Sequence, residues 1–219
     1  KSNMIKNGQK MAKLTFLFVL FALLYSCSNE TPPKLPILGN ADILYKTVDG
    51  KEITDTIYPT IPAFYFLNQD SLPVTNESYK NRVWVVEFFF ATCPTICPIM
   101  NKNMVELQNH FENQSEFGIV SITINPAHDT SEVLKEHAVH LGVKNPNWNF
   151  LTGDKDYIYD LANKGFSIFA GENKASEGGF EHSGLFALID KNGNIRSRKD
   201  EFGNPIVYYD GIEKTGIQA

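Results

Sequence analysis

A pair of cysteines with three residues between them is the part of the sequence with the clearest potential for chemistry. Cys93 and Cys97 form a CxxxC pair, and Pro98 follows it directly. Proline suits the first position of a helix, because its fixed φ fits there and its missing N–H would have had no partner. We therefore expect both thiols at or just before a helix N-terminus. The partial positive charge there stabilises the thiolate, which is the form that binds metals and attacks disulfides.

The spacing of the two thiols predicts what they could bind. Four positions apart, two sulfur atoms can lie about one helical turn apart and converge on one soft metal ion. Two thiolates are one ligand short of a trigonal site, which a single imidazole would complete. Two sulfurs and one nitrogen favour Cu(I), and the same set can rearrange to hold Cu(II). The residues alone thus predict a soft-metal site.

Two other interpretations of the pair stay open. The first is a plain disulfide that locks the loop, although a strand-end position between two prolines is more than a disulfide requires. The second is a thiol–disulfide oxidoreductase, although such enzymes usually have two residues between the cysteines. The sequence shows no Walker loop, HExxH, GxSxG or GxGxxG pattern in a usable context, so hydrolase and nucleotide-binding functions have no support.

The segments around the cysteines predict how the fold positions them. Residues 83–90 form an almost unbroken apolar and aromatic run, which is typical of a central strand covered on both faces. After the cysteines, Met100, Met104, Leu107 and Phe111 recur at helical spacing. This pattern predicts a helix in which both methionines belong to the core rather than to a metal site.

The remaining patterns complete a recognisable order of elements. Further strands are predicted at 61–67, 118–124, 148–151, 184–190 and 194–196. Asp129 and Glu132 predict a capping box that opens a helix ending at Gly142, and a third helix at 156–163 is expected to stop at Gly165. Residues 200–219 show no clear periodicity.

This order predicts an α/β fold, a thioredoxin-like sandwich with a central mixed β-sheet flanked by helices. A right-handed crossover between parallel strands leaves the cysteine loop at the carboxyl end of a central strand. Open α/β sheets place their chemistry at that edge.

The N-terminal 27 residues have the pattern of a secretory signal. Four lysines and no acid precede or flank an apolar run at 14–24, which is too short to span a bilayer comfortably. The segment ending at Cys27 resembles a bacterial lipoprotein box, in which that cysteine carries the lipid. We predict a lipoprotein-type signal peptide at 1–27, a Pro-rich tether at 28–40 and one domain at 41–219. The protein would then be exported to the cell envelope or periplasm and anchored to a membrane by its lipid.

Composition and charge narrow the classes of partner. The chain is 42% hydrophobic and 21% charged, which is ordinary for a globular domain and does not favour a disordered or fibrous protein. The four lysines of the signal leave 16 basic against 25 acidic side chains in the rest of the chain. This balance argues against nucleic acid and against an anionic membrane surface as partners, and it suits a cationic partner.

Residues 85–98, with the sequence VVEFFFATCPTICP, resemble the metal loop of the Sco/SenC family. That family consists of thioredoxin-like copper proteins tied to assembly of the binuclear copper centre of cytochrome c oxidase. Its third ligand is a histidine just before a late strand, a position that His182 matches. The resemblance implies one copper ion, as Cu(I) and/or Cu(II), held by Cys93, Cys97 and His182.

The resemblance also implies a function and a client. It points to a copper metallochaperone that delivers to the copper-centre subunit of cytochrome c oxidase or to another copper or thiol client. A thiol–disulfide reductase of client cysteines, and a copper sensor or antioxidant protein, would use the same residues and stay open.

Outside the proposed ligands, the sequence both departs from the family and offers other histidines. The family commonly has Asp-Pro after the second strand and a basic residue before Asp-Thr, where this chain has Asn125 and His128. We expect His137 and His140 to lie on a solvated helix face and His110 to end a helix.

Overall fold

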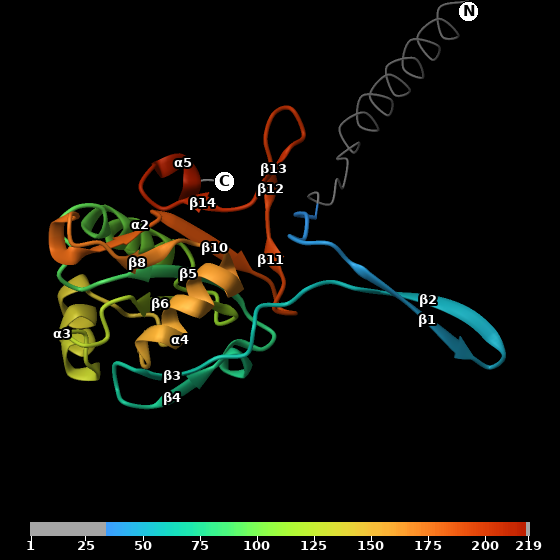
Figure 1. Ribbon diagram of the computed structural model, residues 1–219, viewed down its shortest axis with the longest axis horizontal. Helices are drawn as coiled ribbons and strands as arrows, with labels where there is room; N and C mark the ends of the chain where they lie inside the picture. The colour runs from blue at the N-terminus through green and yellow to red at the C-terminus, as the bar shows by residue number, and fades with distance from the viewer. Residues whose placement is uncertain (1–33, 218–219) are drawn as a thin grey trace, which may run out of the picture. The chain divides into compact units, whose positions relative to one another are not determined.

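An eight-stranded mixed sheet forms the centre of the fold (Figure 1). A computed structural model of the chain describes residues 34–217, so Cys27 and the predicted signal peptide lie outside the described residues. Among residues 34–217 we find no helix with the length and apolar character that a membrane span requires. The predicted α/β class with a central mixed sheet and flanking helices is confirmed.

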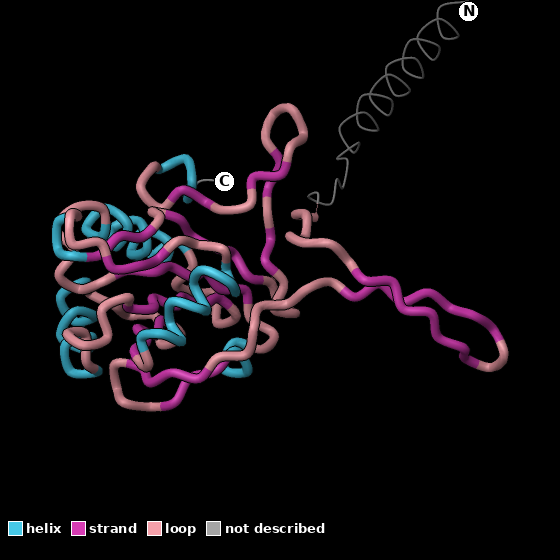
Figure 2. The backbone as a smooth tube through the Cα atoms, in the orientation of Figure 1, coloured by secondary structure: helices cyan, strands magenta, loops and turns pink. Residues whose placement is uncertain are grey.

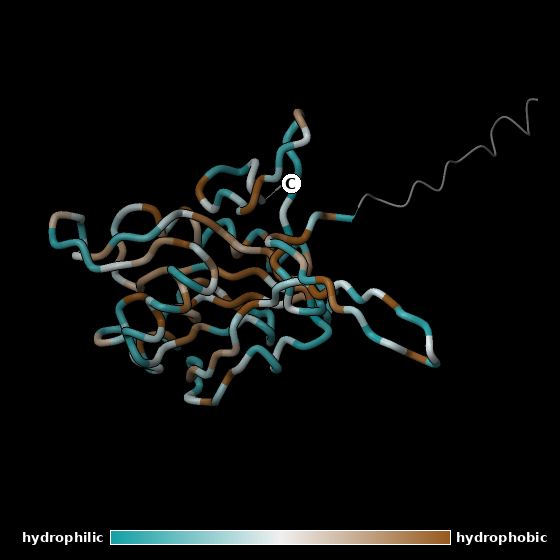
Figure 3. Tube along the Cα trace, turned by 45° about the vertical axis from the view of Figure 1, so that its right-hand side comes forward, coloured by the Kyte–Doolittle hydropathy of each residue, from teal (hydrophilic) through white to brown (hydrophobic). Residues whose placement is uncertain are grey.

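Three parallel strands occupy the middle of the sheet. The strand order is β11-β10-β5-β6-β7-β3-β4, with β14 also paired to β10. The parallel strands are β5 (Val83–Phe89), β6 (Phe117–Thr123) and β7 (Trp148–Thr152). Antiparallel strands continue the sheet on both sides: β10 (Leu185–Ile189), β11 (Ile195–Arg196), β14 (Tyr209–Asp210), β3 (Tyr65–Asn68) and β4 (Pro73–Thr75). Hydrophobic residues concentrate in these central strands (Figure 3).

Helices cover both faces of the sheet. Side chains of neighbouring strand residues point to opposite faces, so Phe88 and Phe89 mark the two sides. Phe89 stacks on His137 of α3 (Ser131–Leu141), which packs beside α2 (Cys97–His110). Phe88 contacts Phe166 in the π-helical turn Leu161–Phe166, which continues α4 (Lys155–Asp160). Both faces of β5 and β6 are therefore buried, as their apolar sequences predict.

Most predicted elements are present, with shifted ends. The first predicted strand is shorter than expected: it begins at Tyr65, and ahead of it the Ile61 N–H donates to the carbonyl of the loop residue Gly193. The third helix runs past the predicted stop at Gly165 and ends at Phe166, before Ser167, whose backbone is left-handed. α3 does end at Gly142, which has a φ of 71°.

The predicted capping box at the start of α3 is wrong. Thr130 is the N-cap, and its side chain accepts a hydrogen bond from the Val133 N–H. Asp129, one position earlier, is fully buried and directs its carboxylate to other partners. Sequence spacing alone could not distinguish these two neighbouring oxygen-bearing side chains, since either residue type can cap a helix.

The sequence analysis did not predict several small elements, although the Asp49-Gly50 pair, with φ of 50° and 74°, is a typical signal for the turn of a two-residue hairpin. The hairpin of β1 (Asp42–Val48) and β2 (Lys51–Ile57) pairs seven residues on each strand and is largely exposed (Figure 2). A second hairpin joins β8 (Ala170–Glu172) to β9 (Phe180–His182). The other small elements are β12 (Arg198–Lys199), β13 (Pro205–Ile206), α5 (Lys214–Ile217) and the 3-10 turns Asn76–Tyr79 and Glu177–Gly179.

The C-terminal part of the predicted tether contacts the domain. The Leu38 N–H donates to the Ile195 carbonyl, and the Ser197 N–H donates to the Pro36 carbonyl. Residues 36–38 thus run along β11. The boundary of the tether at 28–40 stays a prediction.

An acidic side chain lies in the centre of the core. Glu87 on β5 is fully buried, and its Oε1 accepts a 2.6 Å hydrogen bond from Ser121 Oγ. Its Oε2 has no hydrogen-bond partner among residues 34–217. Burial raises the pKa of the Glu87 carboxyl to about 7, against the smaller opposing effect of the Ser121 hydroxyl. The Glu87 carboxyl therefore stays protonated in weakly acidic solution and ionises near neutral pH.

Replacing Glu87 with glutamine should change how stability depends on pH. The folded-state pKa of Glu87 lies above the ordinary value of 4.5 for a glutamate, so the stability linked to protonation is fully present below about pH 4.5 and is lost as the pH rises through about 7. Glu87→Gln cannot ionise, so we expect similar stability of both proteins at pH 4 and a variant more stable by about 3 kcal/mol at pH 8. Urea unfolding of the reduced, metal-free proteins measures this difference. The exposed Glu112→Gln serves as the control, and a parallel pH dependence of wild type and Glu87→Gln would contradict the prediction.

Candidate metal centre

The carboxyl end of β5 leads directly into the cysteine loop. β5 ends at Phe89, and the loop turns at once, with the Cys93 N–H donating to the Phe90 carbonyl at 3.1 Å. α2 begins at Cys97, one residue before the predicted start at Pro98. Cys97 thus occupies the first turn of a helix and Cys93 precedes it by four positions, as the sequence predicts.

A separate hairpin carries His182 to the cysteine loop. His182 ends β9 and pairs with Ala170 on β8. The connection between these strands passes close to the cysteine loop at Gly178, which has a φ of 82°. A Cβ atom at this glycine would lie 2.8 Å from the Phe90 ring, so only glycine allows this approach without a shift. The close packing holds the hairpin against the residues that precede Cys93.

The structure brings the three predicted residues together. The Sγ of Cys97 lies 3.2 Å from the Nε2 of His182, and the ligand atoms of Cys93, Cys97 and His182 all lie within 4.8 Å of one another. All three side chains are buried, with exposed fractions of 8%, 2% and 7%. Among the described residues this is the one group of three or more His, Cys, Asp or Glu side chains with such spacing.

The surroundings of His182 select the ring nitrogen that faces the thiols. Its Nδ1 lies 3.2 Å from the Ser183 carbonyl oxygen. A carbonyl only accepts, so Nδ1 carries the proton and Nε2 presents a lone pair toward Cys97 in the neutral ring. A backbone carbonyl that fixes the tautomer is the usual outer partner of a metal-binding histidine.

The two thiols differ in their acidity. Both cysteines are free thiols. A hydrogen bond from the Cys97 thiol lowers the pKa of Cys93, against the opposing effect of burial. The same hydrogen bond, together with burial, raises the pKa of Cys97. The pair therefore holds one thiolate and one thiol, a combination that can bind a metal on loss of one more proton or can attack a disulfide.

These donors fit a soft monovalent or divalent metal ion. Thiolate sulfur and imidazole nitrogen bind such ions at about 2.0–2.3 Å, so donor atoms within 4.8 Å of one another can reach one ion after a small adjustment. Two sulfurs and one nitrogen match copper better than calcium or magnesium, which prefer oxygen ligands.

The other histidines lie outside this cluster, and one differs from its prediction. His137 is partly buried rather than solvated: its ring packs against Phe89 and Phe150, with centroids 5.4 and 5.7 Å away. Burial lowers the pKa of His137. Its helix face meets aromatic side chains of β5 and β7, which the helix sequence could not reveal. His140 and His110 are exposed at the C-terminal ends of α3 and α2, as predicted.

Both methionines near the cysteines are core residues, as predicted. Met100 and Met104 are fully buried.

The sequence did not lead us to predict two other residues that shape the site and its surroundings. A lone acid inside the apolar run of residues 83–90 could have drawn attention to Glu87, and two consecutive glycines could have drawn attention to the tight approach at Gly178.

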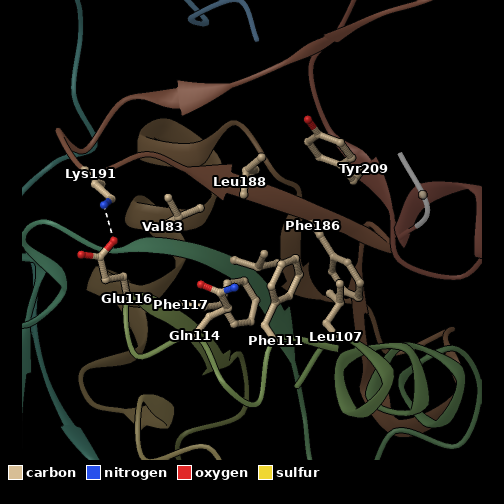
Figure 4. Close-up of a pocket in the computed structure, with 12 residues that line it drawn as sticks. Val83, Leu107, Phe111, Gln114, Glu116, Phe117, Phe186, Leu188, Lys191 and Tyr209 are labelled. Atoms are coloured by element: carbon tan, nitrogen blue, oxygen red, sulfur yellow. Dashed lines mark hydrogen bonds and ion pairs between the residues drawn. The ribbon is translucent and has the colours of Figure 1, made fainter. Parts of the chain in front are cut away.

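A cavity of about 450 Å³ lies at the other end of β5, away from the cysteine loop (Figure 4). Val83 and Val85 at the start of the strand line it together with aromatic side chains of neighbouring elements. Glu116 and Lys191, which form an ion pair, also line it, as do Gln114 and Tyr209. Because this cavity is apolar and distant along β5 from the thiols, it does not belong to the metal centre.

Comparisons with known proteins agree with this geometry. The SCO1/SenC family model matches residues 54–215, a span that contains the central sheet and all three residues of the cluster. The SCO1 protein homolog of Bacillus subtilis (strain 168) is 32% identical over 168 residues, which cover 76% of this chain and 81% of that protein.

Solved structures show the same fold. A SCO1/SenC family lipoprotein from Bacillus anthracis str. Ames has a TM-score of 0.63 and 30% identity, covering 73% of this chain and 89% of that chain. BsSco, described as a Sco family cytochrome c oxidase assembly protein with a disulfide switch, has a TM-score of 0.59 and 29% identity over 71% and 85% of the two chains.

A more distant structure shares the fold as well. ScoI of Bradyrhizobium japonicum, solved with copper bound, has a TM-score of 0.57 and 21% identity over 65% and 90% of the two chains. The family model, the sequence relatives and the fold all agree, and the chain belongs to the SCO1/SenC family.

Proposed function

We propose that this protein is a copper metallochaperone, exported and tethered to a membrane, that serves assembly of the binuclear copper centre of cytochrome c oxidase. The observation that carries the proposal is the meeting of Cys93, Cys97 and His182, whose ligand atoms lie within 4.8 Å of one another. Family membership supports it, because BsSco is described as an oxidase assembly protein and ScoI of Bradyrhizobium japonicum was solved with copper bound.

The three side chains would receive one copper ion as cargo. Cys93 is ready as a thiolate, since its pKa is lowered by the neighbouring thiol. Cys97 would bind after losing its proton to solvent, and His182 would bind through the unprotonated Nε2. Loading of Cu(I) therefore releases a proton from Cys97, and affinity should fall at acid pH as the ligands protonate.

Release would proceed by exchange of ligands. A three-coordinate site leaves room for an incoming thiolate of the client, and each bond to the client would replace one bond to this protein. His182 is well suited to leave first. It is a neutral ligand on a separate hairpin, whereas the two cysteines are charged ligands on one loop.

Export and tethering rest on the N-terminal pattern. Residues 1–27 combine basic residues, an apolar run and Cys27. A SCO1/SenC relative from Bacillus anthracis is described as a lipoprotein, which supports the same assignment here. A lipid on Cys27 would keep the domain near a membrane-embedded client.

The asymmetry of the two thiols favours a second candidate function, reduction of client disulfides. The Cys93 thiolate would attack a client disulfide and form a mixed disulfide, releasing one client thiolate that takes up a proton. Cys97, on losing its proton, would then attack Cys93 and release the second client thiol. The client gains two electrons and the pair becomes a disulfide, which an external dithiol reductant must reduce again.

Removing the imidazole should separate the two functions. We expect the reduced, metal-free wild-type domain to bind one Cu(I), measured by competition with a chromophoric chelator and by native mass spectrometry. His182→Ala should lower the affinity at least about tenfold, because a direct ligand is lost, yet retain reduction of a model disulfide. The exposed His140→Ala is the matched control. Full copper affinity in His182→Ala would show that His182 is not a copper ligand.

Selective alkylation should report the difference between the thiols. Since the pKa of Cys93 is lowered and that of Cys97 is raised, iodoacetamide at pH 6 should modify Cys93 well before Cys97. Peptide mass spectrometry of the reduced protein identifies the site. Cys97→Ala should slow the reaction of Cys93 at pH 6, because the hydrogen-bond donor that stabilises its thiolate is removed. Equal rates at both cysteines would contradict this assignment of the thiolate.

The lipid anchor can be tested on the full chain. Wild-type protein expressed in a bacterial host should incorporate labelled fatty acid and sediment with membranes. Cys27→Ser should lose the label and appear in the soluble fraction of the cell envelope, because the acceptor sulfur is gone. Cys93→Ser provides the control for loss of a different thiol. Label retained by Cys27→Ser would exclude lipidation at this residue.

A further inference from the structure

Asp129 joins the start of the cysteine loop to the end of the neighbouring strand. Its side chain is fully buried, directly before α3. Its Oδ2 accepts hydrogen bonds from the Ala91 N–H at 3.0 Å and from the Thr123 hydroxyl at 2.5 Å. Ala91 lies two positions before Cys93, and Thr123 is the last residue of β6. One carboxylate oxygen therefore connects the two adjacent strand ends on which the site is built.

The second oxygen of Asp129 is also satisfied. Oδ1 lies 2.8 Å from His128 Nδ1, whose side chain is half exposed. A carboxylate only accepts, so Nδ1 of His128 carries the proton. The backbone of the same loop is closed, since the N–H groups of His128 and Asp129 both donate to the Asn125 carbonyl. The His128 side chain and the closed backbone turn thus fix the position of the Asp129 carboxylate beside Ala91.

The hydrogen bond to the Ala91 N–H lies just beyond the last backbone hydrogen bond between β5 and its neighbour β6. The last backbone bond between the two strand ends runs from the Ile124 N–H to the Phe89 carbonyl. Beyond Phe89 the chain enters the cysteine loop, and the Ala91 N–H points to Asp129 rather than to another strand. A hydrogen bond to a charged acceptor is stronger than one between neutral groups, so it can define the direction in which the loop leaves β5.

We propose that Asp129 is a positioning residue for the metal centre, which fixes the cysteine loop so that Cys93 faces Cys97 and His182. The inference rests on the proposed copper-binding function of these three residues. Asp129 touches none of them and acts through Ala91. Partners that hydrogen-bond a metal ligand directly typically contribute about 10–100-fold to metal affinity, and we take the lower end of this range for Asp129, which acts one residue further out.

Substitutions of Asp129 give a graded test. Asp129→Ala removes both acceptors and should lower Cu(I) affinity at least about tenfold. Asp129→Asn keeps one oxygen for Ala91 and Thr123 and should restore affinity to within about threefold of wild type, since the neutral acceptor makes a weaker bond. Thr123→Val removes the hydroxyl that donates to Asp129 and accepts from the Asn125 N–H, but it keeps the Asp129–Ala91 bond and should have a smaller effect than Asp129→Ala. Asp154→Ala, which removes a comparable carboxylate bond to a backbone N–H at the start of α4, is the matched control and should bind copper like wild type.

Two readouts separate positioning from a general loss of stability. Cu(I) affinity is measured by chelator competition, and Cys93 alkylation is measured in the metal-free, reduced protein. Unfolding in urea confirms that each variant is folded under the assay conditions. If Asp129→Ala does not fold, Asp129→Ser carries the same expectations, because its shorter hydroxyl cannot reach both donors.

The outcomes distinguish this inference from the proposed function. A folded Asp129→Ala that binds copper within twofold of wild type and alkylates at the wild-type rate would overturn the positioning role. Lower affinity together with a changed alkylation rate, both recovered in Asp129→Asn, would support it. If wild type itself binds no copper, the proposed function fails, and a changed alkylation rate in Asp129→Ala would still show that this residue positions the loop.

Discussion

The meeting of an imidazole with two thiols across 85 positions of sequence is the constraint on which the site depends. Two separate parts of the fold must bring these side chains to the same point. The parallel sheet places the cysteine loop at the carboxyl end of β5, and the β8–β9 hairpin brings His182 to the same point. A displacement of either part would separate the donors, because a metal ion bridges them only over a few ångströms.

Burial gives this site its chemical character. The donor side chains of Cys93, Cys97 and His182 are almost wholly removed from solvent, so hydrogen bonds among them act in a medium of low polarity. There, two adjacent thiols cannot both ionise readily, and the proton is retained by Cys97 while Cys93 is the thiolate. Copper binding and disulfide chemistry are consequently alternatives open to one and the same pair.

Two buried acids near the sheet show opposite solutions to the cost of burying a carboxyl group. Asp129 has hydrogen-bond donors at both oxygens, which satisfy the charged form. Glu87 has a donor at only one oxygen, so burial favours its protonated form. The first arrangement stabilises the loop that carries the cysteines, whereas the second leaves a group in the core that titrates near neutral pH.

The amino-acid sequence by itself determined the central strands, the helix after the cysteines and the thiol pair. These features follow from local patterns: β5 and β6 are apolar throughout, and α2 repeats its buried residues at helical spacing. His182 was identified through resemblance to a family rather than from its own neighbours. The residues around His182 carry no metal-site pattern of their own, and only its match to the third ligand of the Sco/SenC family connects it to the thiols.

Only the tertiary structure decided which polar groups meet. The Asp129 carboxylate and the Ala91 N–H are 38 positions apart, and the local sequence of Asp129 favoured a helix cap. His137 lies on a helix whose sequence suggested exposure, yet aromatic rings from two strands pack against it and leave it partly buried. Hydrogen bonds and ring contacts of this kind depend on distances of a few ångströms between distant segments. Local periodicity carries no information about such distances, so the fold had to bring the partners together before their roles were visible.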